Sequence, residues 1–265
     1  MDALSGCSSL TASSGPLFAV VGVFDGLHRG HSYLLEQLVR GARERAARPA
    51  VITFDAHPDA VLLGHAPPLL MDQAERLERL ATAGVEVVIV EHFDDVLRQT
   101  PYDAFVRGIS ARTGLAGFLM TPDAAFGHER QGTPETVAAL GSQDGFEVVV
   151  VPPFRLGDRD VRSSDVRAAI ATGDLAAAEL LLGRPYAVRA RNRDGELQPR
   201  LPVAMPPPGD YEVTIASYAE GLGSSSRPEQ QPARLRIDEA GRMWLDRTRG
   251  RSDGAILRAE FVSRN

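Results

Sequence analysis

Lysine is absent from this sequence, so arginine supplies all 29 of its permanently basic side chains. A phosphate-binding P-loop requires a lysine beside the β- and γ-phosphates, and a protein kinase requires one on its third strand. Enzymes that form a Schiff base also need a lysine amine. These three classes are therefore excluded. The absence of lysine can be read simply as a result of genomic base composition, since arginine and alanine are abundant throughout. The three exclusions hold whatever its origin.

Cysteine and long apolar runs are equally scarce. The only cysteine is Cys7, which excludes an internal disulfide and fits a reducing compartment. No run of about 18 apolar residues is present, which argues against a membrane span. Residues 1–14 are small and polar, without the basic and apolar blocks of a signal peptide. We therefore expect a cytoplasmic protein with no membrane partner.

Excess positive charge is missing too, because the formal net charge is −6. Nucleic-acid binding usually requires a strongly basic face, so we expect no nucleic-acid partner. An anionic substrate must instead be bound by a few well-placed groups, since the overall field opposes it.

Short apolar runs rich in Val, Ile and Phe occur throughout the first 155 residues. Stretches with helical spacing separate them, marked for example by Leu34, Leu35 and Leu38. Continuous apolarity is typical of strands buried on both faces, and strand–helix alternation predicts an open parallel sheet. The predicted fold class is therefore α/β and Rossmann-like, with strands at 17–24, 50–54, 85–90, 118–120 and 146–151.

The pattern changes after Val151. Two short helices separated by Gly173 and Asp174 are expected, followed by alternating segments at 211–216, 233–237, 243–245 and 256–262. Turn-forming stretches at 206–209 and 223–228 separate these segments, which predicts a small antiparallel β domain. The expected division is a flexible N-terminal tail (1–16), an α/β domain (17–188) and a β domain (189–265).

The string Gly22-Val-Phe-Asp-Gly-Leu-His-Arg-Gly-His31 runs from the first predicted strand into a helix that we expect to begin near Ser32. Its glycines allow tight turns and close approach to a ligand, and the helix N-terminus favours phosphate. His28 and His31 can point the same way from one turn and donate hydrogen bonds to phosphate oxygens, more strongly if protonated. Two alternatives remain open: half of a metal site, and a strand-to-helix turn with incidental histidines.

Three later positions permit related chemistry. Ser163 and Ser164 suit either a helix cap or phosphate binding beside Arg167. His57 follows a strand end, where it reaches a ligand crevice or serves as a turn residue before Pro58. Asp55 suits orienting a histidine, helping to hold Mg²⁺, or simply ending a strand.

The Gly22–His31 string resembles the His-x-Gly-His motif of nucleotidyltransferases, in the form found in bacterial FAD synthetases. Those bifunctional proteins join an FMN adenylyltransferase module to a riboflavin kinase module. Three further segments resemble the same family in order: Thr53-Phe-Asp-Ala-His-Pro58, Asp123-Ala-Ala-Phe-Gly127 and Ser163-Ser-Asp-Val-Arg167. Gly183-Arg-Pro-Tyr186 resembles the link between the modules, so the resemblance covers residues 17–186.

The resemblance implies transfer of AMP from ATP to FMN, which gives FAD and pyrophosphate, with Mg²⁺ bridging the phosphates. Nucleotide and flavin are thus the expected partners, and no metal ligands are assigned. The implied catalytic residues are His28, His31 and Arg167. The implied ATP-binding residues are Gly22, Phe24, Asp25, Gly26, Gly30, Ser163 and Ser164. The implied FMN-binding residues are Asp55, His57, Pro58, Asp123 and Phe126.

The sequence departs from the family on the acceptor side and in the C-terminal region. Ala56, Thr121, Ala124, Ala125 and Arg162 stand where other residues are usual. The Gly-x-Pro-Thr-x-Asn motif of riboflavin kinase is absent, so we expect a degenerate kinase remnant without kinase activity. Two alternatives to FMN adenylylation stay open: a nucleotidyltransferase with another phosphorylated acceptor, and a non-catalytic paralogue that binds nucleotide or flavin.

Overall fold

The computed structural model of the chain describes residues 1–218, 230–246 and 254–262. The chain folds into two units. Unit 1 contains Met1–Phe24, Gly30–Pro67 and Leu77–Asp160, and unit 2 contains Asp25–Arg29, Pro68–Arg76 and Val161–Asn265. Each unit is therefore built from stretches that are far apart in the sequence.

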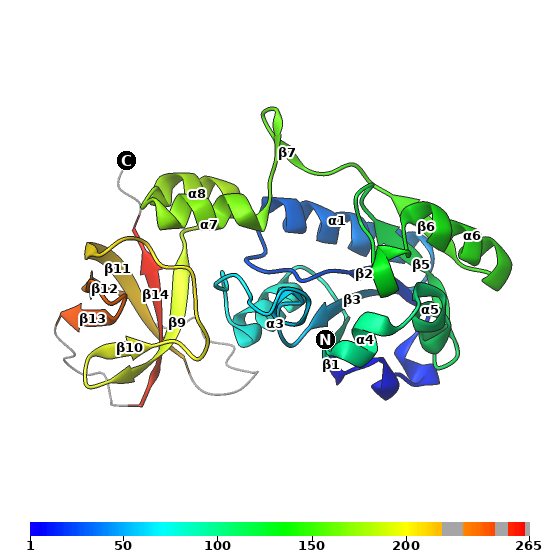
Figure 1. Ribbon diagram of the computed structural model, residues 1–265, viewed down its shortest axis with the longest axis horizontal. Helices are drawn as coiled ribbons and strands as arrows, with labels where there is room; N and C mark the ends of the chain where they lie inside the picture. The colour runs from blue at the N-terminus through cyan, green and yellow to red at the C-terminus, as the bar shows by residue number, and fades with distance from the viewer. Residues whose placement is uncertain (219–229, 247–253, 263–265) are drawn as a thin grey trace. The chain divides into compact units, whose positions relative to one another are not determined.

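Unit 1 is organised around a six-stranded parallel sheet with the order β1-β4-β3-β2-β5-β6 (Figure 1). The α/β, Rossmann-like prediction is thereby confirmed. Each of the five predicted strands is present within a few residues of its expected bounds. The strands are β1 (Asp2–Ser5), β2 (Leu17–Val21), β3 (Arg48–Phe54), β4 (Val87–Glu91), β5 (Leu115–Met120) and β6 (Glu147–Val150).

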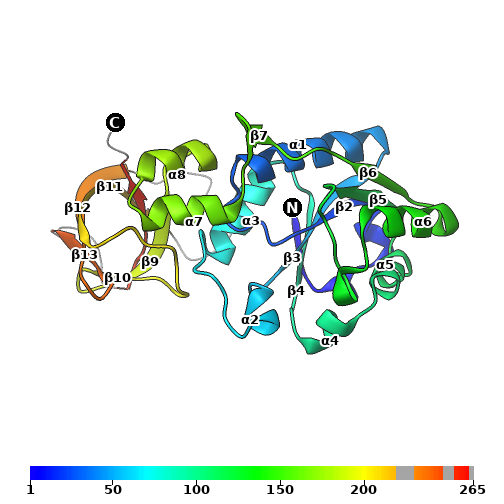
Figure 2. The ribbon, with the colours of Figure 1, turned by 45° about the horizontal axis from the view of Figure 1, so that its top comes forward.

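Helices cover both faces of this sheet. Val106 of α5 and Val137 of α6 pack in one apolar cluster with Leu17 and Ala19, while Gly41 of α1 approaches the ring of Phe18, which points to the opposite face. Both views show α1 running along the sheet (Figures 1 and 2). The helices are α1 (Arg29–Glu44), α2 (Asp59–Leu62), α3 (Gln73–Thr82), α4 (Asp95–Gln99), α5 (Tyr102–Ser110) and α6 (Pro134–Asp144). Short 3-10 turns lie at η1 (Cys7–Ser9), η2 (Ala12–Ser14) and η3 (His128–Arg130), and a hairpin is formed by β7 (Arg155–Leu156) and β8 (Arg159–Asp160).

The N-terminal residues differ from the flexible tail that the sequence suggests. Asp2–Ser5 form β1, which pairs in parallel with β4 at the edge of the sheet. The guanidinium of Arg48 donates to the carboxylate of Asp2 at 2.7 Å, and the side chain of Leu10 is buried in the core. Backbone pairing and one buried leucine thus order a segment whose composition is small and polar.

The strand order changes direction at β2, which lies between β3 and β5. In open parallel sheets, ligands bind beyond the carboxyl ends of the strands at such a switch in order. The segments that follow β2, β3 and β5 carry most of the residues singled out in the sequence. The fold of unit 1 therefore brings Gly22–Phe24 and the segments that follow β3 and β5 to one edge of the sheet.

Unit 2 contains a closed six-stranded antiparallel barrel with the order β10-β13-β12-β11-β14-β9, which confirms the predicted small β domain. Its apolar core includes Val213, Leu235, Leu257 and Phe261. The predicted 223–228 turn lies outside the described residues. The strands are β9 (Ala187–Arg193), β10 (Glu196–Gln198), β11 (Gly209–Tyr218), β12 (Gln230–Ile237), β13 (Met243–Asp246) and β14 (Ile256–Phe261).

The two helices expected before the barrel are α7 (Ser163–Ala171) and α8 (Leu175–Leu182). The Asp174 carboxylate accepts the backbone N–H of Ala177 and caps α8, and Gly183 ends it at φ 73°. Both helices cluster with the barrel, whereas the sequence pattern suggests a division after residue 188. Among the described residues, no helix has the length and apolarity needed to cross a membrane.

Candidate active site

The loop between β2 and α1 holds the residues of the Gly22–His31 string. Its backbone turns sharply, because Phe24, Gly26 and Leu27 have φ values of 52°, 80° and 38°. Non-glycine residues with positive φ persist only where their surroundings hold them, and such residues concentrate at functional sites. Phe24 and Leu27 are both buried, so packing holds this loop in its conformation. Helix α1 begins at Arg29, three residues before the predicted Ser32, which places Gly30 in its first turn.

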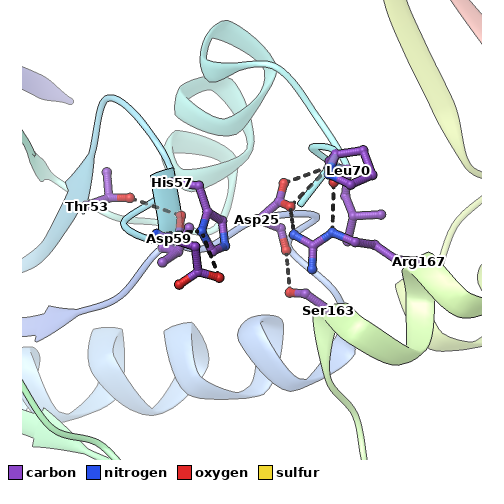
Figure 3. A network of polar contacts seen from close by, with 9 residues as sticks. Asp25, Thr53, His57, Asp59, Leu70, Ser163 and Arg167 are labelled. Carbon is purple, nitrogen blue, oxygen red and sulfur yellow. Dashed lines mark hydrogen bonds and ion pairs between the residues drawn. The ribbon is translucent and has the colours of Figure 1, made fainter. Parts of the chain in front are cut away.

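Asp25 lies at the centre of a buried polar network (Figure 3). Its carboxylate accepts the backbone N–H of Leu70 at 2.9 and 3.1 Å and the guanidinium of Arg167 at 2.5 Å. Arg167 also donates to the carbonyl of Pro68 at 2.8 Å, and the Ser163 hydroxyl donates to the carbonyl of Asp25 at 3.0 Å. We call these five residues the Asp25 cluster; they all belong to unit 2.

Two glycines of the loop fit their surroundings closely. A Cβ on Gly26 would lie 2.6 Å from Cδ1 of Leu70, which is too close for a carbon–carbon contact. Gly22 follows β2 and donates its N–H to the carbonyl of Ile52 at 3.0 Å. The predicted need for glycine at these positions thus has a steric basis at Gly26.

Helix α7 uses its first residues differently from a simple serine cap. Arg162 occupies the N-cap position, and its backbone N–H is accepted by the Asp165 carboxylate at 3.2 Å. Ser163 instead reaches the loop through Asp25, while Ser164 is exposed. Ser163 and Arg167 thus contact the loop that carries His28.

His28 is buried, with 5% of its surface exposed. Burial, and then the positive charges of Arg184 and Arg167, lower the pKa of His28 to about 4. The imidazole is therefore neutral at pH 7 before an anion binds. A neutral imidazole still donates one N–H to a phosphate oxygen. A bound triphosphate would oppose the two arginine charges and favour protonation.

Arg184 is a functional candidate that the sequence motifs do not single out, although it stands in the noted Gly183-Arg-Pro-Tyr186 stretch. Its guanidinium donates to the carbonyls of Gly26 and Leu27 at 2.6 and 3.0 Å. It thereby fixes the backbone just before His28 and contributes a positive charge there. A single sequence cannot show that one guanidinium will donate to the carbonyls of two neighbouring residues more than 150 positions away.

His31 lies in the first turn of α1 and is half-buried. Its ring is 5.0 Å from the ring of Phe24, at an interplanar angle of 44°. Phe24 thus contacts the imidazole of His31 in addition to its place in the loop.

The residues after β3 form two pairs within unit 1. Asp55 and His92 are joined at 2.6 Å, and the hydrogen bonds from His92 and the Phe93 backbone outweigh burial and lower the pKa of Asp55. The same hydrogen bond raises the pKa of the exposed His92. His57 accepts the N–H of Asp59 at 3.2 Å through Nδ1 (Figure 3). Asp55 is thus paired with His92, a histidine outside the predicted site residues.

Three other expected site residues lie after β3 and β5. Pro58 precedes α2, and Asp123 is exposed and accepts the Thr121 hydroxyl at 2.8 Å. Phe126 packs its ring against Phe105 and Phe118, each at 5.8 Å between centroids. Phe126 therefore contributes to the apolar core as well as to this end of the sheet.

Within the described parts of the chain, no three His, Cys, Asp or Glu side chains gather in a way that would hold a metal ion. The carboxylate nearest the histidines in sequence is Asp25, which is occupied by Leu70 and Arg167.

A family model described as FAD synthetase matches residues 11–165, which include the whole loop and the first three residues of α7. The chain belongs to the FAD synthetase family. It is 34% identical over 173 residues to a bifunctional riboflavin kinase/FMN adenylyltransferase of Haemophilus influenzae, covering 64% of this chain and 56% of that protein. The protein of the same description from Escherichia coli is 32% identical over 178 residues, covering 66% and 57%.

The protein of this description from Bacillus subtilis is 28% identical over 212 residues, covering 73% of this chain and 65% of that protein. The aligned regions thus span between about half and two thirds of the length of these relatives. A crystal structure described as a macrolide-efflux protein from Streptococcus pneumoniae has a TM-score of 0.79 and 20% identity, covering 100% of this chain and 90% of that one. At that identity the likeness concerns the fold alone.

Proposed function

We propose that this FAD synthetase family member transfers AMP from ATP to FMN, which gives FAD and pyrophosphate. The observation that carries the proposal is the family match over residues 11–165, which contain both histidines of the Gly22–His31 string. The curated relatives named for FMN adenylyltransferase support the same activity.

In the proposed reaction, an FMN phosphate oxygen attacks the α-phosphorus of ATP. A new P–O bond forms as the bond from the α-phosphorus to the bridging oxygen breaks, and pyrophosphate leaves with that electron pair. Little covalent chemistry by the protein is needed, because positioning and charge neutralisation dominate such transfers. ATP enters as its Mg²⁺ complex, with the cation bound to phosphate oxygens and water.

We assign the catalytic role to His28, His31 and Arg167. The imidazoles donate hydrogen bonds to the triphosphate and then to the departing pyrophosphate, whose negative charge favours the protonated form of His28. Arg167 adds a permanent positive charge while it remains bonded to Asp25. The backbone of the loop and the first turns of α1 and α7 bind ATP through Gly22, Phe24, Asp25, Gly26, Gly30, Ser163 and Ser164.

We assign the flavin side to unit 1, where the segments after β3 and β5 meet one edge of the sheet. Apolar and aromatic contacts suit an isoalloxazine ring, and polar groups fix its orientation. The proposed FMN-binding residues are Asp55, His57, Pro58, Asp123 and Phe126.

The barrel (residues 189–265), beyond the nucleotidyltransferase domain (17–188), is proposed to lack riboflavin kinase activity, because the sequence has no Gly-x-Pro-Thr-x-Asn motif. We further propose that the protein works in the cytoplasm, where ATP is available to it.

The test is to incubate the purified protein with ATP, Mg²⁺ and FMN and to separate FAD from FMN by chromatography. FAD and pyrophosphate should appear in equal amounts, and a His28→Ala/His31→Ala variant is the matched control. Riboflavin with ATP should give no FMN. Product from other phosphate esters but not from FMN would indicate a different acceptor, and no product from any would indicate a non-catalytic binding protein.

A further inference from the structure

Two buried arginines lie side by side on the outer wall of the barrel. Arg189 of β9 and Arg258 of β14 are directly opposite in the antiparallel register. Leu257 and Ala259 point into the barrel core, so Arg258 between them points outward. Yet Arg189 and Arg258 are only 9% and 7% exposed. This part of the wall is therefore covered, and like charges placed opposite each other need acidic partners.

One acidic partner comes from the segment Pro68–Arg76, which belongs to the same unit as the barrel. The Glu75 carboxylate binds Nε of Arg258 at 3.4 Å, and its side chain is 5% exposed. Glu260 provides a second carboxylate at 2.6 Å from the Arg258 guanidinium. Arg258 therefore binds both its strand neighbour Glu260 and the Pro68–Arg76 segment, and removing Glu75 or Arg258 takes away the buried ion pair with that segment.

Backbone hydrogen bonds hold the same segment against the chain that leads into β11. The N–H of Leu69 donates to the carbonyl of Pro202 at 2.9 Å, and the N–H of Ala204 donates to the carbonyl of Leu69 at 2.8 Å. The Tyr186 hydroxyl then donates to the carbonyl of Ala204 at 2.6 Å. The segment is thus paired on one side like a strand.

The opposite side of this segment forms part of the Asp25 cluster. In an extended chain, the N–H and C=O of one residue point to one side, and those of its two neighbours point to the other. Leu69 faces the barrel side, whereas the N–H of Leu70 binds Asp25 and the carbonyl of Pro68 accepts from Arg167. A single short stretch therefore joins the barrel to the loop that carries His28.

We propose that the C-terminal barrel is a positioning element for adenylyl transfer, acting through the buried Glu75–Arg258 pair and the Pro68–Arg76 segment on Asp25. The inference rests on the proposed function for its catalytic consequence. It gives the barrel a role in the N-terminal reaction that does not depend on kinase chemistry. Glu75 and Arg258 are positioning residues, since they act through Leu70 and Asp25.

The experiment compares the full-length protein with Glu75→Gln, Arg258→Met and the double variant. Hydrogen exchange of the Leu70 amide, measured by NMR without substrate, reports whether the segment still binds Asp25. Steady-state FAD synthesis then gives kcat and KM for FMN. Asp238→Asn is the matched control, because it removes a carboxylate from the same barrel that binds Arg242 and not the segment.

Each single variant should accelerate exchange of the Leu70 amide about 10-fold or more, since the local opening becomes easier. The value of kcat should fall about 10-fold with KM for FMN within about twofold, as expected for a contact that acts on the transition state. The double variant should be no worse than either single one, because one pair carries the coupling. Asp238→Asn should match the wild type in both measurements.

Wild-type exchange of the Leu70 amide in both single variants would overturn the proposal. If Glu75→Gln does not fold, Arg258→Met decides alone, and wild-type exchange of its Leu70 amide would overturn the proposal. Arg258→Lys retains the positive charge, so its Leu70 amide should exchange more slowly than that of Arg258→Met. A wild-type protein that makes no FAD would remove the proposed function, whereas the exchange measurement would still decide whether the barrel holds the segment.

Discussion

The carboxylate of Asp25 binds the guanidinium of Arg167, 142 positions further along the chain. The pair joins the loop after β2 to the start of α7, and Asp25 is almost fully buried. The two elements that carry the His28 and Ser163 motifs are thus linked directly. Asp25 thus connects two distant elements, a structural role that its position in a glycine-rich motif does not by itself indicate.

Asp25→Asn should lower the free energy of unfolding by about 2–4 kcal/mol, because Arg167 loses its buried counter-charge. Urea denaturation followed by circular dichroism measures the change. Glu44→Gln is the control, since the Arg40–Glu44 pair is exposed and such pairs contribute about 0–1 kcal/mol. Equal stabilities for Asp25→Asn and the wild type would contradict a structural role for the pair.

His28→Ala and His31→Ala should each reduce kcat for FAD formation by about 10²–10³, the usual effect of losing one transition-state contact. The near-ultraviolet circular dichroism spectra should stay close to that of the wild type. Steady-state kinetics with FMN and ATP varied separately provides the measurement. Turnover at the wild-type rate in both variants would reject their catalytic assignment.

Stability should fall as the pH is lowered from 6.5 towards 4 because of His28. Its pKa is about 4 in the folded protein and near 6.5 when unfolded, so the unfolded state binds the extra proton within this window. The contribution of His28 is fully present above pH 6.5 and is lost as the pH falls, by about 2–4 kcal/mol in total. Urea denaturation at intervals of pH, compared with His28→Asn, isolates this share.

Arg184→Gln tests the cause of the same shift. It removes the second contribution to the lowered pKa of His28, so an NMR titration should give a value closer to 6.5 than in the wild type. Burial and the positive charge of Arg167 would then account for the part of the shift that remains. A His28 pKa that does not rise in this variant would mean that the Arg184 charge has no influence on the imidazole.

Gly26→Ala should destabilise the protein and impair ATP binding, because the new Cβ would lie 2.6 Å from Leu70. Gly64→Ala is a matched control: Gly64 also has a positive φ, of 74°, but has open space around it. The loss in free energy of unfolding should be about 1–3 kcal/mol larger for Gly26→Ala than for Gly64→Ala, which is the range for overpacked sites. Calorimetric melting measures the loss of stability, and titration with ATP measures the loss of affinity. Equal losses of stability in Gly26→Ala and Gly64→Ala would show that the positive φ alone, and not the contact with Leu70, causes the destabilisation.

Much of the fold could be predicted because its main strands are continuous apolar runs. The edge strand β1 could not, since its sequence Asp-Ala-Leu-Ser is mostly exposed and gives no alternating pattern. The expected helix start near Ser32 is late, because the loop tightens before His28 and α1 begins at Arg29.

The candidate site likewise has features that the sequence predicts and others that it does not. Glycines and histidines close together in sequence indicate a phosphate-binding loop, so His28 and His31 stand out from the sequence alone. The Asp25–Arg167 pair and the contacts of Arg184 depend on residues separated by more than 140 positions, for which a single sequence gives no signal. The neutral state of His28 follows from burial among arginines and is likewise invisible before folding.

Unit 2 combines the early segments Asp25–Arg29 and Pro68–Arg76 with the C-terminal residues. This arrangement has a consequence for folding during synthesis on the ribosome. The parallel sheet is complete in the nascent chain once β6 has emerged, whereas the hydrogen bonds of Leu69 must wait for Pro202 and Ala204. Such long-range closures are slow and occur late. A nascent chain that ends before Pro202 and Ala204 therefore contains the His28 loop without these hydrogen bonds, and the loop reaches its final conformation only after they have formed.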